Sequence, residues 1–215
     1  MDKKALARKT ISLYAEAGLK SIFSRIRFWD APYFEVEALV PKKGYIVDIG
    51  CGEGIFSNFL ALTSSKRKVL GVEIDKKRLA IADRGVRNVS FSSGDATKFK
   101  FKNTDAVVLF HLLHHLPSYK DQEKTLDFCY QGLKKGGKLI IVEIDVKPTF
   151  KYFLSWFTDH FLVPLLFENR FYSPIYFRKK AEWTKLLKSY GFAISTHLAE
   201  KDKPFSHIIF VCKKK

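Results

Sequence analysis

A short apolar segment that ends in three closely spaced glycines constrains the fold of this chain more than any other feature. Residues 45–49 (Tyr-Ile-Val-Asp-Ile) read as a buried strand, because apolar and β-branched residues dominate a short run. Gly50, Gly52 and Gly54 follow at alternate positions, and an apolar helical pattern begins at Ile55. A backbone without Cβ can turn sharply and lie against a ligand, and a helix start offers free N–H groups to an anionic group. Strand, glycine turn and helix in this order predict the first βα unit of a nucleotide-binding α/β sheet.

The spacing of the glycines distinguishes this turn from two better-known phosphate-binding loops. The dinucleotide fingerprint G-x-G-x-x-G and the Gly-Lys-Ser/Thr ending of a P-loop are both absent. A second apolar strand, residues 69–74, carries Glu73 near its end, 19 residues after Gly54. A carboxylate at this position can accept hydrogen bonds from both hydroxyls of a ribose, so the pair of motifs predicts a nucleoside-containing ligand.

Three segments resemble the class I S-adenosylmethionine-dependent methyltransferases. Residues 47–54 (Val-Asp-Ile-Gly-Cys-Gly-Glu-Gly) are similar to the first motif of that family, and residues 94–96 (Gly-Asp-Ala) resemble its adenine-binding turn. Residues 111–117 resemble the Leu-His-His-Leu-Pro signature of the small-molecule subgroup. The resemblance covers about residues 44–145, with a weaker likeness over 182–192. It implies S-adenosyl-L-methionine as the cofactor, held by Asp48, Gly50, Cys51, Gly52, Gly54, Glu73, Ile74, Asp95, Ala96 and Phe110.

The alternation of strands and helices predicts an α/β fold with a parallel sheet. The resemblance implies a Rossmann-like, seven-stranded, mostly parallel sheet with helices on both faces and an antiparallel last strand. Strands are expected at 45–49, 69–74, 89–93, 105–110, 138–143, 194–197 and 207–212, and helices at 3–28, from 55 to about 63, at 76–86, from 117 to about 134 and at 182–192. A chain of 215 residues suits one domain. We divide it into an N-terminal helical cap (1–43), a cofactor-binding core (44–145), an aromatic lid insertion (146–180) and a C-terminal helix with strands (181–215).

Residues 148–177 differ from the rest of the chain in holding eleven aromatic side chains. Asp159, His160 and Pro164 interrupt the segment, so it should not span a bilayer, which needs about 20 consecutive apolar residues. The segment lies where the resembled family inserts a substrate lid. Some of these rings can pack on the core, and the remainder predict an apolar chamber for a lipophilic acceptor: a lipid, a quinone-like phenol or an acyl chain on a carrier protein.

Two histidines are candidates for the catalytic base. A hydroxyl acceptor must lose a proton when it is methylated, and histidine suits that role near neutral pH. His114 aligns with the catalytic histidine of the plant phenolic O-methyltransferases that this segment resembles, while His111 lies closer to the end of the preceding strand. The sequence leaves both open, as it does a purely structural role for either. We therefore predict an S-adenosylmethionine-dependent enzyme that methylates oxygen.

The net charge of +16 favours anionic partners, and an alternative function follows from it. Anionic membrane, an acidic carrier protein, nucleic acid and simple solubility all remain open. Residues 3–28 form a basic amphipathic segment with an apolar stripe at Leu19, Ile22, Phe23 and Ile26, which fits either a cap over the active site or a membrane-surface helix. The alternative function is an rRNA or tRNA methyltransferase. Residues 109–112 (Leu-Phe-His-Leu) disfavour it, because amino-directed base methylases carry Asn/Asp-Pro-Pro-Tyr/Phe at that position.

The positions of the cysteines indicate in which cellular compartment the protein is expected. Cys51, Cys129 and Cys212 lie far apart without C-x-x-C spacing, so neither a disulfide framework nor a metal site is expected. The start of the chain lacks the charged and then apolar pattern of a signal peptide. These features predict a cytoplasmic protein, with contact at the inner membrane face left open. The oligomeric state is left open as well.

Overall fold

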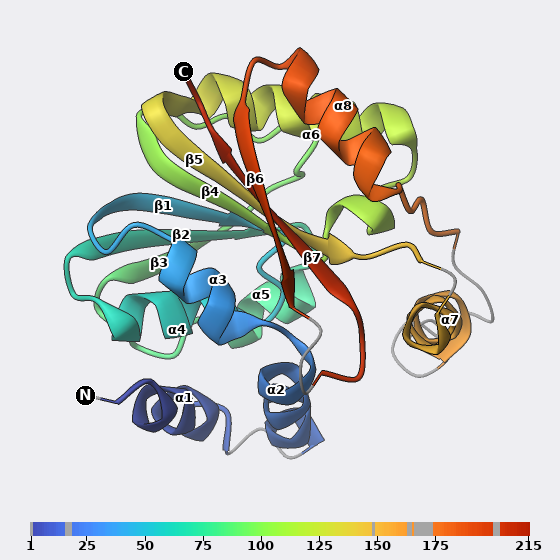
Figure 1. Ribbon diagram of the computed structural model, residues 1–215. Coiled ribbons are helices and arrows are strands. Elements are labelled where there is room, and N and C mark those ends of the chain that lie inside the picture. The colour runs from blue at the N-terminus through green and yellow to red at the C-terminus, as the bar shows by residue number, and fades with distance from the viewer. Residues whose placement is uncertain (1, 16–18, 148, 163–164, 166–173, 200–202) are drawn as a thin grey trace.

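Seven strands form one mixed sheet at the centre of the molecule (Figure 1). The computed structural model describes residues 2–15, 19–147, 149–162, 165, 174–199 and 203–215, without the side chains of residues 19–24 and 162. The strands are β1 Gly44–Ile49, β2 Arg67–Glu73, β3 Val89–Ser93, β4 Thr104–Phe110, β5 Leu133–Ile144, β6 Ala193–Ala199 and β7 His207–Lys213. Their order is β3-β2-β1-β4-β5-β7-β6, and β7 runs antiparallel to both of its neighbours. The predicted Rossmann-like sheet with an antiparallel last strand is therefore confirmed.

Helices cover both faces of the sheet (Figure 1). They are α1 Lys3–Ser12, α2 Leu19–Asp30, α3 Tyr33–Leu39, α4 Ile55–Thr63, α5 Lys76–Ala82, α6 Tyr119–Gly132, α7 Phe150–Phe157 and α8 Lys180–Ser189. One hydrophobic cluster joins α1–α4 to one face, and a second joins α6 and α8 to the other. Along β4, Ala106 and Val108 belong to the first cluster, whereas Val107 and Leu109 belong to the second. This alternation explains why the strand is apolar from Ala106 to Phe110, since both of its faces are buried there.

Three expected boundaries were wrong. The helix expected over 76–86 ends at Ala82, because Asp83 accepts a hydrogen bond from the Gly85 N–H and Gly85 takes a left-handed φ of +70°. The helix expected to reach about residue 134 ends at Gly132, and β5 starts five residues earlier than expected, because Leu133 already pairs with Thr104 of β4. For residues 3–28 the sequence allowed one helix or two helices broken at Gly18, and the structure has two, α1 and α2.

Helix α7 lies to one side of the layered core (Figure 1). It follows β5, and hydrogen bonds and ring contacts tie it to the body: Lys151 Nζ donates to the Lys203 carbonyl at 2.8 Å, and the Tyr152 ring meets Phe177 edge-on at 5.9 Å. Within the described ranges, no helix is long and apolar enough to cross a membrane.

The chain leaves β1 and β4 toward opposite sides of the sheet. From β1 it crosses to β2, and from β4 it crosses to β5, so these two neighbouring strands form the point at which the strand order reverses. Ligands of open α/β sheets bind at the carboxyl ends of the strands at such a point. The glycine turn follows β1, and the two candidate histidines follow β4.

Candidate active site

The glycine turn after β1 adopts a conformation that requires glycine. Gly50, Gly52 and Gly54 have φ values of +75°, +56° and +72°, a region that side chains with Cβ rarely adopt. A Cβ at Gly50 would lie 2.7 Å from Leu112 Cδ1, and one at Gly54 would lie 2.7 Å from the Phe91 ring. The protein itself therefore packs against this loop closely enough to exclude a side chain at either position.

Glu73 joins the end of β2 to the glycine loop. Its Oε2 accepts the Gly52 N–H at 2.8 Å, and its Oε1 accepts the N–H groups of Ile74 and Asp75 at 2.8 and 3.0 Å. The Glu73 carbonyl accepts the Gly94 N–H at 3.0 Å. The three segments that resemble cofactor motifs, after β1, β2 and β3, are thus held side by side by hydrogen bonds through one residue.

Asp48 lies beneath the loop and is almost fully buried. Its Oδ2 accepts a hydrogen bond from Ser57 Oγ at 2.6 Å, which braces the first turn of α4. Burial raises the pKa of Asp48 to about 7; the Ser57 hydrogen bond opposes this rise, and the negative charge of Glu73 adds to it. Asp48 Oδ1 has no hydrogen-bond partner within the described residues.

The remaining predicted cofactor residues differ in exposure. Asp95 holds its own turn, since its Oδ1 accepts from the Thr97 N–H at 2.8 Å and from Thr97 Oγ1 at 2.7 Å. Ile74 is 65% exposed beside the loop. Cys51 is half-buried, and burial raises the pKa of its thiol. The other two are buried, namely Ala96 and Phe110, whose ring packs among aromatic core side chains.

His114 is paired with a buried carboxylate. Its Nδ1 lies 2.5 Å from Glu143 Oε2, and Glu143 Oε1 accepts the Leu113 N–H at 3.1 Å, so the carboxylate is fixed at the end of β5. The other ring nitrogen, Nε2, lies 3.8 Å from Asp159 Oδ2, beyond hydrogen-bond distance. Burial lowers the pKa of His114, but Glu143 and then Asp159 outweigh it, and the net pKa lies above its ordinary value.

His111 belongs to a separate hydrogen-bonded circuit. His207 Nε2 lies 2.9 Å from the Asp30 carbonyl, which can only accept, so this network places the proton on that nitrogen. His207 Nδ1 then accepts from His111 Nε2 at 3.0 Å. His111 Nδ1 is left to face Arg27, 3.5 Å from Nη2, and Arg27 Nη1 lies 3.4 Å from Asp30 Oδ2.

Both histidines of the circuit are held neutral. Burial lowers the pKa of His207 to about 3, and burial followed by the charge of His207 lowers that of His111 well below its ordinary value. His111 also takes φ = +50°, an uncommon conformation for a residue with a side chain. Its backbone is therefore strained at the position where β4 ends.

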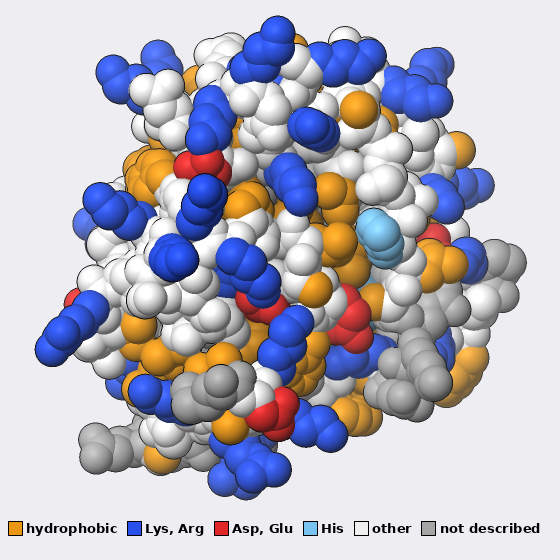
Figure 2. Space-filling view, turned by 60° about the vertical axis from the view of Figure 1, so that its left-hand side comes forward, with side chains coloured by type: hydrophobic (Ala, Val, Ile, Leu, Met, Phe, Trp, Pro, Cys, Tyr) orange, Lys and Arg blue, Asp and Glu red, His pale blue; other side chains and the backbone are white. Residues whose placement is uncertain are grey.

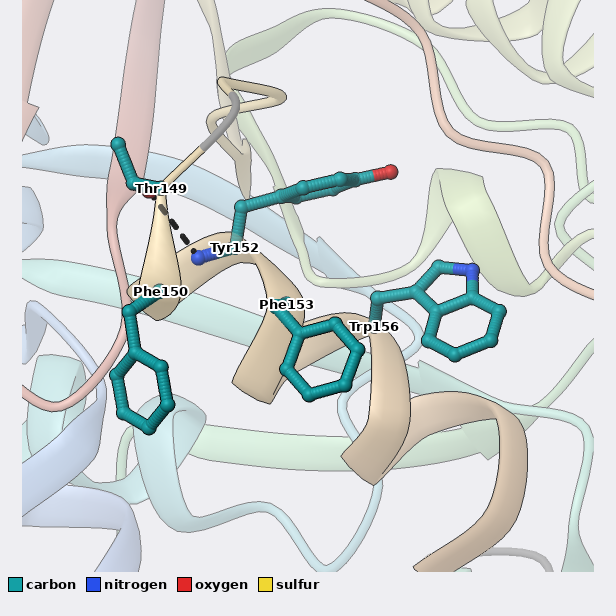
Figure 3. A pocket seen from close by; sticks show the side chains of 5 residues that line it. All are labelled: Thr149, Phe150, Tyr152, Phe153 and Trp156. Carbon is teal, nitrogen blue, oxygen red and sulfur yellow. Dashed lines mark hydrogen bonds between the residues drawn. The ribbon is translucent and has the colours of Figure 1, made fainter.

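Part of the predicted lid packs against His114. The Phe177 ring stacks on His114 at 5.0 Å between centroids, and the His114 carbonyl accepts the Tyr176 N–H at 2.9 Å. Trp156 contacts His160 at 4.7 Å between ring centroids. A hollow of about 520 Å³, open to solvent, lies against α7 and is lined by Thr149, Phe150, Tyr152, Phe153 and Trp156 (Figure 3). The expected lid aromatics Phe167, Phe171 and Tyr172 lie outside the described residues.

The N-terminal segment reaches the glycine loop. Tyr14 donates to the Glu53 carbonyl at 2.8 Å and accepts from Asn58 Nδ2 at 2.9 Å, so the chain after α1 is fastened to the loop and to α4. The side chains of three members of the apolar stripe expected in α2 lie outside the described residues. Its fourth member, Ile26, is 45% exposed.

Four residues of this site were not predicted from the sequence. They are Arg27 from α2, Glu143 from β5, Asp159 from the π-helical segment Thr158–Leu162 and His207 from β7. Glu143 carried a usable signal, because an acid inside an apolar strand run needs a partner when it is buried. The other three carried no comparable local signal. No group of three or more side chains suited to hold a metal ion occurs in the described part of the chain.

Residues 47–141 match the family model of a methyltransferase domain. An uncharacterized methyltransferase of Bacillus cytotoxicus is 32% identical over 117 residues, which cover 53% of this chain and 54% of that protein. A ubiquinone biosynthesis O-methyltransferase of Pseudomonas savastanoi is 27% identical over 117 residues, covering 51% of this chain and 47% of that protein. This chain therefore spans about half the length of these two relatives.

A solved structure shares the fold at low sequence identity. The magnesium protoporphyrin IX methyltransferase of Synechocystis, with bound SAH, superposes with a TM-score of 0.65 and 20% identity, covering 85% of this chain and 82% of that one. Residues 47–141 therefore resemble a methyltransferase domain, and the sheet that contains them has the fold of this solved enzyme.

The cofactor of this methyltransferase domain is S-adenosylmethionine, and the residues present fit it. The glycine loop leads directly into the start of α4, where free backbone N–H groups can bind a carboxylate such as the one this cofactor carries. Glu73 presents a carboxylate fixed by three backbone N–H groups at the position where ribose hydroxyls are bound in such sheets. The exposed Ile74 and the Asp95 turn lie next along the same edge.

Proposed function

We propose that this chain transfers the methyl group of S-adenosylmethionine to a hydroxyl oxygen of a lipophilic small molecule. The cofactor supplies an electrophilic methyl group when bound, so the protein has to position the acceptor and remove its proton. In this proposal the cofactor contacts come from Asp48, Gly50, Cys51, Gly52, Gly54, Glu73, Ile74, Asp95, Ala96 and Phe110.

The observation that carries the proposal is the pairing of His114 with Glu143. A carboxylate on Nδ1 holds the imidazole in one tautomer and directs the lone pair of Nε2 outward, an arrangement that serves general bases on many folds. An acceptor hydroxyl within about 3 Å of Nε2 can pass its proton to that nitrogen. Nε2 makes no hydrogen bond to the described residues around it.

His111 is the weaker candidate for the base. Its Nε2 is bonded to His207, and its Nδ1 faces the Arg27 guanidinium, so neither nitrogen is open to an acceptor. Its lowered pKa also gives it little affinity for a proton. We assign His111 instead to holding the end of α2 against the tip of β4.

The surroundings of His114 support a lipophilic acceptor. Phe177 stacks on its ring, and Tyr152 and Trp156 lie on the same side of α7, half-buried. The similar Pseudomonas protein is named for ubiquinone biosynthesis, and a quinone precursor is a phenol with an apolar chain. A free lipid or an acyl chain on a carrier belongs to the same chemical class of acceptor. The proposal keeps the division into cap, core, lid and C-terminal part, with the lid and the end of α2 meeting at the acceptor.

The alternative, methylation of rRNA or tRNA, rests on net charge alone. Figure 2 shows Lys and Arg side chains scattered over one face of the molecule with hydrophobic side chains between them. They do not gather on that face into a single basic stripe of the kind that follows a nucleic-acid backbone.

Labelled methyl transfer from S-adenosylmethionine tests the proposal. The purified chain is offered phenolic lipids extracted from its host and, separately, total RNA. We expect label in the lipid fraction and none in RNA; label in RNA alone would refute the proposal. His114→Gln should lower turnover about 10²- to 10⁴-fold with unchanged affinity for S-adenosylhomocysteine. His197→Gln, which changes an exposed histidine on β6, is the matched control and should retain full activity.

A further inference from the structure

Helix α7 presents two unlike stripes. Phe150, Phe153 and Phe157 recur at i, i+3 and i+7 and are 77%, 57% and 45% exposed. Side chains with this spacing lie along one face of a helix. Three phenylalanines in a row on a solvent-facing stripe are far more than the scattered apolar residues of an ordinary surface.

The opposite stripe fixes the orientation of the helix. Ser155 is buried, Tyr152 and Trp156 are half-buried, and Tyr152 meets Phe177 of the body edge-on. At the start of α7 the Thr149 side chain accepts the Tyr152 N–H (Figure 3). The inner stripe therefore packs on the protein, and rotating α7 to bury the three phenylalanines would expose this stripe instead.

The end of α2 carries two further exposed apolar side chains. Trp29 is 61% exposed and Ile26 is 45% exposed. Lys203 joins the two helices: its Nζ donates to the Trp29 and Ala31 carbonyls at 2.9 Å, and its own carbonyl accepts from Lys151 of α7 at 2.8 Å. We call Ile26, Trp29, Phe150, Phe153 and Phe157 the aromatic face.

Positive charge surrounds the aromatic face. Arg25 is exposed on α2, Lys147 and Lys151 flank the start of α7, and Lys203 lies between the helices. Two of these cations lie near acids: Lys147 pairs with Asp145 at 2.5 Å, and the charges of Glu35 and Asp30 act on Lys203. The chain as a whole carries +16. Exposed aromatic side chains with basic neighbours are the composition of helices that lie in the interface of an anionic bilayer, whereas the centres of protein interfaces are depleted of lysine.

We propose that the aromatic face docks on the surface of an anionic phospholipid bilayer. The inference rests on the proposed function and deepens it, because it places the acceptor supply in a membrane. The inner stripe of the same helix lies beside Phe177, which stacks on His114, so a lipid-borne acceptor reaches the base by crossing one helix. The hollow in Figure 3 borders both stripes.

Vesicle flotation of the intact chain tests the docking surface. The vesicles consist of phosphatidylcholine alone or of equal parts of phosphatidylcholine and phosphatidylglycerol, at low and high salt. We expect flotation with the anionic vesicles, weakened by salt because headgroup attraction is screened. Phe150→Ser/Phe153→Ser should weaken partition roughly tenfold or more, since each ring contributes buried apolar area. Both side chains are exposed, so the variant should unfold at the same temperature as the parent.

Leu198→Ser is the matched control. Leu198 is 53% exposed on β6 and should change partition by no more than about twofold. Equal flotation of the parent and the double Phe variant would overturn the proposal. So would self-association of the parent that the double variant abolishes, with no binding to vesicles, because the occupant of the face would then be a second copy of the chain.

Vesicle binding and methyl transfer can be tested independently of each other. Turnover of a water-soluble phenol by the parent chain measures methyl transfer without a membrane. A chain that methylates this phenol but ignores anionic vesicles refutes the docking surface alone. A chain that floats with anionic vesicles but methylates neither phenols nor lipids supports the surface and refutes the proposed function.

Discussion

Replacing Glu73 by alanine tests the cofactor site most directly. The carboxylate accepts three backbone N–H groups, from Gly52, Ile74 and Asp75, at 2.8 to 3.0 Å. The Gly52 bond is buried, whereas Ile74 is largely exposed, so water can replace the carboxylate at the latter but not at Gly52. An unpaired buried N–H costs about 1–3 kcal/mol, and we expect the free energy of unfolding to fall by that amount.

Cofactor affinity should fall as well. If Glu73 also accepts the ribose hydroxyls, its loss removes hydrogen bonds to a charged group, which contribute about 1.5–3 kcal/mol. That corresponds to roughly a 10- to 150-fold rise in the dissociation constant for S-adenosylhomocysteine. Calorimetric titration measures this constant, and thermal unfolding without ligand measures the effect on the loop, at about 2–4 °C per kcal/mol for a chain of this size.

Affinity and unfolding temperature together distinguish a role of Glu73 in cofactor binding from a role in the loop alone. A lower unfolding temperature with unchanged affinity would show that Glu73 only braces the loop and that the ribose is bound elsewhere. Glu53→Ala is the control within the same loop, because among the described residues the Glu53 carboxylate has one ion pair, with Arg78 at 4.0 Å. An ion pair of this length contributes about 1 kcal/mol or less, so a comparable loss of affinity in that variant would also refute the reasoning.

Two further substitutions test the buried charges. Glu143→Gln should shift the acid limb of the turnover–pH profile to lower pH, because Glu143 raises the pKa of His114 and the base acts in its neutral form. The control Asp145→Asn, two residues further along the chain, should leave the acid limb in place. An unmoved acid limb in Glu143→Gln would exclude His114 as the base. Asp48 has a folded pKa of about 7 against an ordinary value of 3.8, so the folded state binds its proton more tightly and loses stability as pH rises between these values. Asp48→Asn removes this titration. The free energy of unfolding of the variant, measured with urea, should therefore rise relative to that of the parent by up to about 4 kcal/mol between pH 4 and pH 8. A constant difference between variant and parent across that range would contradict the burial argument.

Local patterns predicted the centre of the sheet because its inner strands are mostly apolar on both faces and the turn after β1 carries glycine. The run from Tyr45 to Ile55 contains the strand, the left-handed turn and the start of α4, all set by neighbours in sequence. The same is true of the Asp95 turn, which Thr97 closes within two residues. The sequence could therefore predict cofactor contacts for the glycine loop and the Asp95 turn, and these contacts remain predictions.

The acceptor end of the site could not be predicted in the same way. Glu143 meets His114 only because β4 and β5 are adjacent, and Asp159 approaches only because the chain after α7 returns to His114. The basic amphipathic pattern of the N-terminal segment gave no indication that Arg27 would face inward to His111. Likewise, eleven aromatics in one segment do not reveal which of them turn outward, because that depends on the partner of each stripe of α7.

The hydrogen-bond network around His111 affects the order in which native contacts form during folding. Its hydrogen bonds join residues 84, 96 and 177 positions apart, whereas the Glu73 bond to the glycine loop spans 21. Contacts across long stretches of chain form late, since their loop-closure entropy is lost before they can stabilise anything. On the ribosome, His207 emerges after β1 to β6, so the nascent chain can complete the contacts of Glu73 long before His111 meets His207. A translation arrest before β7 would leave the strained residue at the tip of β4 without its support.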